Sequence, residues 1–482
     1  MAPDEMSQEP IWRWSASRIA QAVRTGRTSA EEVVREVLAR VEHVNPSINA
    51  FALIDAQGAM TQALQRDQAR AAGAQAGPLE GVPFHVKDLV PTAGLETSYG
   101  SWAMQGNVPQ TDARAVARVK AAGAILLGKT TTPEFGTKIQ TESPRYGPTR
   151  NPWRLTRSPG GSSGGAAAAV ASGMGPVAVN TDGAGSARIP ASCCGILGYK
   201  PSLGLVPNDM AAALFENNQY IGLNTRTVGD LAIMLTVMNG PDPGDPWTLG
   251  RDRQEFVCPQ DPHMAVRGLR VLYVPLMGNR TVDADVAALV DGALGRLREL
   301  GVTVTTLAEP FDWGIELSTA WLKGMLQARL VPLLATHRNR LDPELVAVLE
   351  GANDVTADQR ASLPLQRTQL YRRVQHLFDT DDLIISPTLA APPIALNHRS
   401  SEPLVIGGTE AGSLREAWYP YTSVANMTGH PAISIPVGFT PDRLPVGLQA
   451  MGPLHQDQRL IDLAAALEML LPWGHTWPGE PA

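Results

Sequence analysis

Cysteine and aromatic residues are scarce in this chain of 482 residues. Only three cysteines occur, Cys193, Cys194 and Cys258, and aromatic side chains make up 5% of the sequence. An odd, sparse set of cysteines argues against a disulfide framework and is typical of a reducing compartment. The adjacent Cys193 and Cys194 lack zinc-site spacing, and no other His, Cys and carboxylate residues have metal-ligand spacing. We therefore expect no metal and no cofactor, and we expect the two adjacent thiols to be buried.

Other features are missing as well. No apolar run reaches the roughly 18 residues that suggest a membrane span. Residues 1–12 lack the basic region and apolar run of a signal peptide. The net charge of −7 gives no sign of a basic surface for nucleic acid. These absences predict a soluble cytoplasmic protein with no membrane or nucleic-acid partner, either a monomer or a homodimer.

Helical and strand patterns alternate along the chain. Ser29 and Glu32 form a capping box, and Pro46 is expected to close the helix that follows. Expected helices cover 15–45, 56–75, 112–122, 165–173, 283–299 and 457–471. Expected strands cover 82–86, 124–127, 177–180, 267–275, 301–306, 384–385 and 433–437. This alternation predicts an α/β fold on a largely parallel or mixed sheet, in one large domain.

Two short motifs point to other enzyme classes, and we reject both. Residues 123–130, GAILLGKT, fit a phosphate-binding loop, but their four apolar residues predict a buried strand rather than exposed N–H groups. Residues 160–164, GGSSG, fit the nucleophile elbow of α/β-hydrolases, which requires a preceding strand. Two prolines and scattered arginines precede this motif, so no strand is expected there.

A third stretch of small residues, DGAGS at 182–186, ends at Ser186. Glycines allow close backbone approach, so such a turn can gather N–H groups around a developing oxyanion. Taken alone, the stretch is more typical of an ordinary glycine-rich turn.

Several long segments in constant order resemble the amidase signature family. They are GVPFHVKDL (81–89), GAILLGKTTTPEFG (123–136), TRNPWRLTRSPGGSSGGAAAAVASG (149–173), NTDGAGSARIPASCCGILGYKPS (180–202), TRTVGDLAIML (225–235) and NMTGHPAISIPVGF with LPVGLQ (426–449). Together the co-linear motifs are far more specific than any single glycine loop. The resemblance implies a central mixed sheet covered by helices on both faces, and hydrolysis of amide bonds without a cofactor.

The resemblance also implies roles for individual residues. Lys87 matches the family's lysine, Ser162 the serine usually held by a cis peptide, and Ser186 the nucleophile. The oxyanion-hole N–H groups fall on Gly183, Ala184 and Gly185, with Asp182, Arg188 and Ser163 as supporting residues. Ala184 stands where the family usually has glycine, which puts the fit of some substrates in question.

The same resemblance divides the single domain into four parts. Residues 1–75 supply N-terminal helices and residues 76–240 the catalytic core motifs. Residues 241–380 form a variable part, and residues 381–482 the C-terminal part of the core. The loops near 205–224 and 310–370 carry no interpretable motif.

Lys87 can act as a base only when it is neutral, so its pKa must fall well below the usual value of about 10.4. The apolar residues before Lys87 are consistent with the burial that lowers such a pKa. His85 shares a strand face with Lys87 and can tune it or line the pocket, although a packed, hydrogen-bonded histidine is favoured.

Aromatic residues near the C-terminus bear on the substrate. Trp418, Tyr419 and Tyr421 suggest an aromatic wall that suits an apolar or aromatic amide, anilide or carbamate. The TRNPW and DGAGSARIPAS segments are most similar to the aryl-amide, carbamate and nylon-oligomer hydrolase branch. The main alternative is an A-subunit-like glutamine amidotransferase component acting in a complex, which has a charged residue just before the position of Asn426. A binding protein without catalysis is disfavoured because all three catalytic positions are present.

Overall fold

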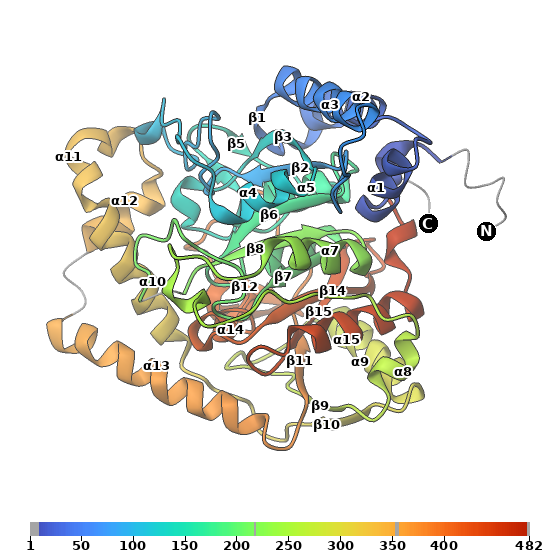
Figure 1. Cartoon of the computed structure of the whole chain (residues 1–482). Helices are drawn as coiled ribbons and strands as arrows, with labels where there is room; N and C mark the ends of the chain where they lie inside the picture. Colours follow the sequence, from blue (N-terminus) through green and yellow to red (C-terminus); the bar gives the residue numbers. More distant parts are fainter. Residues whose placement is uncertain (1–8, 216–217, 352–355, 480–482) are drawn as a thin grey trace.

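A long mixed β-sheet runs through the protein, as the computed structural model shows (Figure 1). The structure describes residues 9–215, 218–351 and 356–479. Within these residues the sheet has 11 strands, in the order β1-β3-β2-β6-β8-β7-β14-β15-β11-β9-β10. Their bounds in that order are Phe51–Ile54, Ile125–Thr130, Pro83–Lys87, Val177–Asp182, Tyr220–Thr225, Leu197–Lys200, Ala432–Phe439, Pro445–Met451, Leu383–Pro387, Arg270–Tyr273 and Thr303–Thr306. The strands β3, β2 and β6 are parallel to one another, so their carboxyl ends meet at one edge of the sheet.

Helices cover both faces of this sheet. The longer ones are α1 Ala16–Arg24, α2 Ala30–Ile48, α3 Ala56–Ala71, α4 Arg114–Ala121, α5 Gly164–Ala171, α6 Arg188–Cys194, α7 Val228–Met238, α9 Ala284–Glu299 and α15 Asp457–Leu470. In strand β7, successive side chains point to opposite faces of the sheet and meet helices on both. A side chain at Gly198 would meet Ala191 of α6, whereas the Tyr199 hydroxyl on the other face donates to Asp457 at the start of α15.

Smaller elements connect these helices and strands. They are α8 Pro262–Val266, α14 Ser423–Thr428, and two hairpins, β4 Glu142–Ser143 with β5 Gly147–Pro148 and β12 Leu404–Ile406 with β13 Thr409–Gly412. No helix in the described ranges has both the length and the apolar composition needed to cross a bilayer.

The predicted α/β fold is confirmed. The two motifs that were rejected from the sequence also behave as expected. The strand expected at 124–127 is β3, and it continues through Gly128, Lys129 and Thr130 as a buried strand instead of forming a phosphate loop. The GGSSG motif follows turns and two isolated bridges, Asn151 with Arg154 and Arg157 with Ala395, so the strand needed for a nucleophile elbow does not precede it.

One expected boundary was wrong. Pro46 does not close its helix, because α2 includes it and ends at Ile48. The end is set instead by Asn49, which adopts the left-handed conformation, and by the Asn45 side chain, which accepts from the Ala50 amide. A proline removes one backbone donor, but here the helix stops only where these asparagines redirect the chain.

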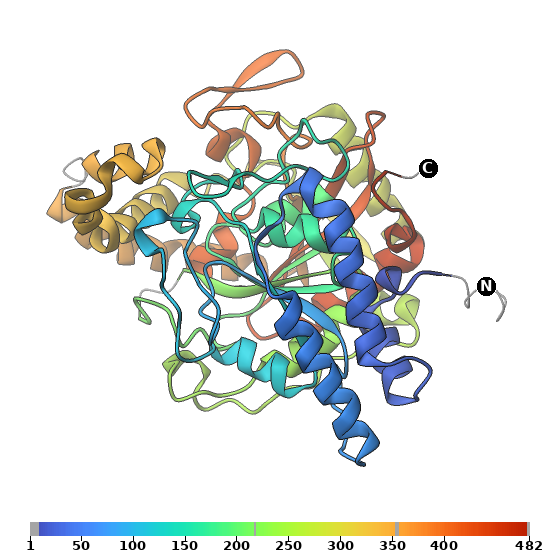
Figure 2. The same cartoon turned by 90° about the horizontal axis from the view of Figure 1, so that it is seen from above.

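The region near 310–370, which carried no motif, forms a separate helical group. It contains α10 Ile315–Leu330, α11 Leu334–His337, α12 Pro343–Glu350 and α13 Ala357–Leu377, in gold and orange at the side of the molecule in Figures 1 and 2. A small apolar cluster of Leu326, Leu330, Leu345 and Leu349 joins α10 to α12, and Phe135 of the core packs against it. These helices therefore lie against the edge at which the catalytic motifs end.

Helix α5 packs against the sheet through a glycine that leaves no room for a side chain. A Cβ on Gly165 would lie 2.6 Å from both the carbonyl oxygen of Ala50 and the amide nitrogen of Thr131. We expect Gly165→Ala to lower the free energy of unfolding by about 1–3 kcal/mol, because backbone atoms cannot move aside cheaply. Urea unfolding followed by circular dichroism measures the change.

The matched control is Gly292→Ala in α9. A Cβ there has no neighbour within 4 Å. This substitution should stabilise the protein by about 0.5–1 kcal/mol through helix propensity alone. Equal stability of Gly165→Ala and the wild type would contradict the close packing of α5.

Candidate active site

The amine of Lys87 is buried among hydroxyl groups. Lys87 ends β2 and is fully buried, and its Nζ lies 2.7 Å from Ser162 Oγ, 2.9 Å from Ser163 Oγ and 3.0 Å from Thr181 Oγ1. Within the described residues Lys87 forms no ion pair. Burial lowers the pKa of Lys87 well below 10.5, and the more distant charge of Asp182 opposes this only in part. The site thus favours a neutral amine.

The two adjacent serines differ in what their protons can do. Ser163 Oγ donates to the carbonyl oxygen of Thr181 at 3.1 Å, so it can only accept from Lys87. Ser162 follows a cis peptide bond after Gly161, and among the described residues its hydroxyl contacts Lys87 alone. Ser162 is therefore the serine whose proton is available to the lone pair of a neutral lysine.

The turn before Ser186 is organised by the carboxylate of Asp182. This carboxylate accepts from the amides of Gly185 (2.8 Å) and Ala187 (3.1 Å), and it pairs with both Nε and Nη2 of Arg188. Asp182 and Arg188 both have 0% side-chain exposure. Burial alone would raise the pKa of Asp182, but the Arg188 charge and hydrogen bonds outweigh it and lower the pKa to about 2.

Asn426 and Gln449, from the C-terminal part of the chain, complete the set of contacts around Asp182 and Arg188, which we call the Asp182 brace. Asn426 Nδ2 donates to Asp182 Oδ1 at 2.9 Å, and its Oδ1 accepts from Arg188 at 2.7 Å. Gln449 Oε1 accepts from the remaining Arg188 nitrogen at 2.7 Å. Every charged atom of the buried pair thus has a partner, as a buried ion pair requires.

The oxyanion turn differs from the expectation at one position. The N–H of Gly185 is already used by Asp182, so it cannot also bind a substrate oxygen. In the described part of the chain, the N–H groups of Gly183 and Ala184 donate to no protein acceptor, and both residues border the pocket. Of the three amides expected from the sequence, these two remain as donors for an oxyanion.

The conformation of the turn explains which of its residues must be glycine. Gly185 has φ +109°, and a Cβ there would lie 2.3 Å from Thr422 Oγ1. Ala184 is outside the left-handed region, so its methyl group fits the backbone without strain. The carbonyl of Ala184 is held by Thr422 Oγ1 at 2.7 Å.

Ser186 opens onto a pocket beside these groups. Ser162, Thr181, Gly183, Ala184 and Ser186 border the pocket on one side. The rest of the lining is Leu89, Phe135, Gly136, Asn218, Gln219, Leu322, Met325, Leu326 and Arg329. The apolar part of this lining comes in part from α10, through Leu322, Met325 and Leu326.

The four residues expected to line the substrate pocket lie elsewhere. His85 is fully buried against Phe51, and neither ring nitrogen has a partner within the described structure, so the expected hydrogen bond is absent. Burial lowers the pKa of His85 to about 3. Trp418 and Tyr421 are core residues whose polar atoms donate to the carbonyl oxygens of Ala391 and Pro275.

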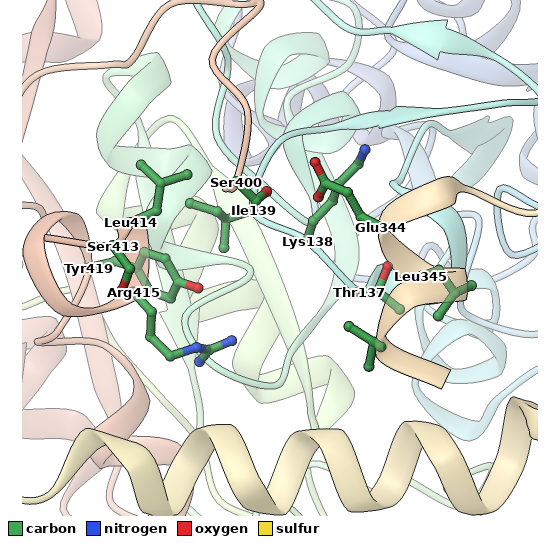
Figure 3. A pocket seen from close by; sticks show the side chains of 11 residues that line it. Thr137, Lys138, Ile139, Glu344, Leu345, Ser400, Ser413, Leu414, Arg415 and Tyr419 are labelled. Atoms are coloured by element: carbon green, nitrogen blue, oxygen red, sulfur yellow. The ribbon is translucent and has the colours of Figure 1, made fainter. Parts of the chain in front are cut away.

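Tyr419 borders a different pocket. Figure 3 shows Tyr419, Arg415 and Leu414 on one side of this pocket and Thr137, Lys138 and Glu344 on the other. Ser186 does not border this pocket. The aromatic wall inferred from sequence therefore belongs to the core and to a neighbouring pocket.

Several contributing residues were not found from sequence. Thr181 contacts Lys87, and Gln449 contacts Arg188. Thr181 had a usable signal, since it lies one residue before the end of β6, which is parallel to the strand that carries Lys87. Gln449 lies too far along the chain for spacing to reveal it.

The remaining predictions concern metals and thiols. In the part of the chain that the structure describes, no group of three or more His, Cys, Asp or Glu residues could hold a metal. Cys193 and Cys194 are free and buried, as expected.

Comparisons with known proteins cover nearly the whole chain. The family model described as Amidase matches residues 32–461. An acylamidase from Rhodococcus erythropolis is 37% identical over 98% of this chain and 99% of its own length. The A component of a glutamyl-tRNA(Gln) amidotransferase from Acidothermus cellulolyticus is 33% identical over 95% of this chain and 94% of its own. The crystal structure of a bacterial aryl acylamidase of the amidase signature family has 30% identity and a TM-score of 0.89, covering 98% of this chain and 100% of that one.

The Asp182 brace leads to a stability prediction. Asp182→Asn removes the charge that compensates buried Arg188, so we expect a loss of about 3–5 kcal/mol in unfolding free energy at pH 7. The depressed pKa means that the carboxylate's contribution is fully present above pH 3.8 and is lost as pH falls through about 2. Chemical unfolding at neutral pH therefore measures the full contribution of this carboxylate to the free energy of unfolding.

A partly exposed carboxylate provides the comparison. Asp382 pairs with Arg459 at 2.7 Å, with 22% and 39% of the two side chains exposed. Asp382→Asn should cost about 1 kcal/mol or less, because solvent screens the pair. Similar losses for the two variants would show that Asp182 is not a buried structural charge.

Proposed function

This chain belongs to the amidase family and hydrolyses carbon–nitrogen amide bonds, and from that premise we propose a serine mechanism that uses Lys87, Ser162 and Ser186. The observation that carries the proposal is the environment of Lys87. Its Nζ is buried, has three hydroxyl neighbours and has no carboxylate partner among the described residues. Burial favours the neutral form of such an amine, and only the neutral form can act as a base.

The proposed proton path begins at the hydrogen bond between Lys87 and Ser162, and it continues to Ser186, which borders the same pocket as Ser162. Neutral Lys87 takes the Ser162 proton, Ser162 takes the Ser186 proton, and Ser186 Oγ attacks the carbonyl carbon. The negative charge that develops on the carbonyl oxygen is stabilised by the N–H groups of Gly183 and Ala184. The proton then returns from Lys87 through Ser162 to the leaving nitrogen, which departs as an amine.

The acyl-enzyme is hydrolysed by the reverse relay. Water gives its proton through Ser162 to Lys87 while its oxygen attacks the ester carbon. Collapse of the second tetrahedral intermediate returns that proton to Ser186 and releases a carboxylic acid. Each step moves one proton among Lys87, Ser162 and the reacting groups, so the proposed mechanism needs no further acid or base.

The pocket favours a small apolar or aromatic amide, anilide or carbamate. Leu89, Phe135, Leu322, Met325 and Leu326 supply the apolar part of its walls, beside polar groups such as Asn218 and Gln219. Apolar walls combined with placed polar groups are typical of sites for small organic ligands. The similarity to an acylamidase and to an aryl acylamidase supports this substrate class.

We do not favour the amidotransferase alternative. The eight residues before Asn426, WYPYTSVA, contain no charged residue, and no carboxylate borders the pocket within the described ranges. The ammonium group of free glutamine would therefore have no counter-charge there. Amide hydrolysis by the chain alone, without partner subunits, would support the hydrolase.

Substitution of the proposed nucleophile gives the principal test. We expect Ser186→Ala to reduce kcat on an acetanilide by about 10⁴-fold or more, because no other hydroxyl is positioned to attack. Ser162→Ala should lose nearly as much, since it breaks the relay. Ser163→Ala should lose less, because that hydroxyl only supports Lys87.

The control is Ser172→Ala. Ser172 is buried beyond α5, and its hydroxyl has no partner among the described residues. Its removal should leave the rate close to that of the wild type. Near-normal hydrolysis by Ser186→Ala would refute the mechanism.

The state of Lys87 predicts the pH dependence. Because burial lowers the pKa of Lys87 well below 10.5, the lysine loses its proton at a lower pH than an exposed lysine and becomes protonated as the pH falls through that lowered pKa. We therefore expect kcat/KM to decrease on the acid side as pH drops through this lowered pKa. A rate profile with a neutral anilide over pH 5–10 measures it. An increase that begins only near pH 10.5 would show that Lys87 is normally charged.

A further inference from the structure

The pocket at Ser186 continues into a second pocket. Five residues border both pockets, namely Leu89, Phe135, Thr181, Gln219 and Arg329. The second pocket is otherwise lined by Val90, Pro91, Tyr99, Ala113, Asn208, Met210, Ala211, Ala212 and Ile221. A substrate held at Ser186 can therefore extend past Thr181 into this second space.

Arg329 is the only formally charged side chain on the described lining of either pocket. It lies in the last turn of α10 and is exposed. Within the described residues it forms no hydrogen bond and no ion pair. Its charge is thus presented to the joined pockets without a protein partner.

The surroundings of Arg329 suit an anion with an apolar body. A guanidinium group binds a carboxylate through two parallel hydrogen bonds, a geometry that a lysine cannot reproduce. Nothing on the described lining offers a carboxylate to a positively charged substrate group, so a zwitterion would leave its ammonium unpaired. The adjacent walls combine apolar side chains, including Pro91, Ala113 and Ile221, with the uncharged polar groups of Asn208 and Gln219.

We infer that Arg329 selects amide substrates that carry a carboxylate at the end remote from the scissile bond. This inference rests on the proposed function, because it places the scissile carbonyl at Ser186. The carboxylate pairs with Arg329 where the two pockets join, and an apolar or aromatic spacer fills the distance to the nucleophile. Arg329 contributes to binding and takes no part in proton transfer.

Matched substrates test this inference. One pair consists of anilides that carry a 4-carboxylate or a 4-nitro group on the leaving ring. A second pair carries the same two groups on a benzoyl acyl ring. Carboxylate and nitro groups have similar shape, and comparing the wild type with Arg329→Gln cancels their different electronic effects.

We expect Arg329→Gln to lower the carboxylate-to-nitro ratio of kcat/KM about tenfold in one of the two pairs, the equivalent of about 1.4 kcal/mol. The change should appear mainly in KM, because the pairing exists before chemistry begins. Arg329→Glu should lower the ratio further through repulsion. The affected pair also identifies which side of the amide extends toward Arg329.

The control variant is Arg296→Gln on α9, whose arginine is 53% exposed and distant in sequence from both pockets. Its ratios should match those of the wild type, and thermal unfolding checks that every variant is folded. An unchanged ratio in both pairs for Arg329→Gln would overturn the inference. So would equal losses for carboxylate and nitro substrates, which would give Arg329 a structural role only.

Failure of the mechanism gives a different result. If Ser186→Ala still hydrolyses the neutral anilides at the wild-type rate, the proposed function fails regardless of Arg329. If Ser186→Ala is inactive and the Arg329→Gln ratio is unchanged, only the inference about the carboxylate fails.

Discussion

The buried carboxylate of Asp182 is the constraint on which the active site depends. It fixes the turn that presents Ser186 by accepting from two backbone amides, and it holds Arg188 and Asn426 in place. Its negative charge also favours protonation of Lys87, which the proposed mechanism requires to be neutral. The direct pairing with Arg188 limits this conflict, because the charge that organises the turn is already balanced. Asp182 can thus hold the turn in place without strongly favouring the charged form of Lys87 only while its ion pair with Arg188 is intact.

Much of the fold was predictable because its signals are local. The apolar run before Lys87, the alanine-rich stretch after Ser163 and the apolar residues before Asp182 each specify an element without help from distant residues. Boundaries were less predictable, as at Pro46, where side chains of neighbouring asparagines determine the end of the helix. The residues expected for the catalytic site lie together, but their co-linear motifs identified them, since no single loop is distinctive.

The substrate pocket was not predictable for a physical reason. Its walls combine Phe135 from the core with Leu322, Met325 and Arg329 from α10, which are nearly two hundred residues later in the chain. Apolar residues at helical spacing predict a helix, but they do not reveal the surface against which it packs. The aromatic residues at 418–421 misled for the same reason, because composition does not distinguish a core side chain from a pocket wall. Catalytic groups and pocket walls thus come from different parts of the chain, so substrate preference can change in α10 while the proton relay is kept.

The distance along the chain between Asp182 and its partners has a consequence for biosynthesis. Asn426 follows Asp182 by 244 residues, and Gln449 follows Arg188 by 261. A growing chain on the ribosome therefore carries Lys87, Ser162 and Ser186 long before it contains the groups that complete the brace around Arg188. Until those residues emerge, the turn lacks its full set of contacts and cannot hold its donors in position. The fully braced turn is thereby confined to chains whose synthesis has passed Gln449, and shorter chains lack the contacts that Asn426 and Gln449 make with Asp182 and Arg188.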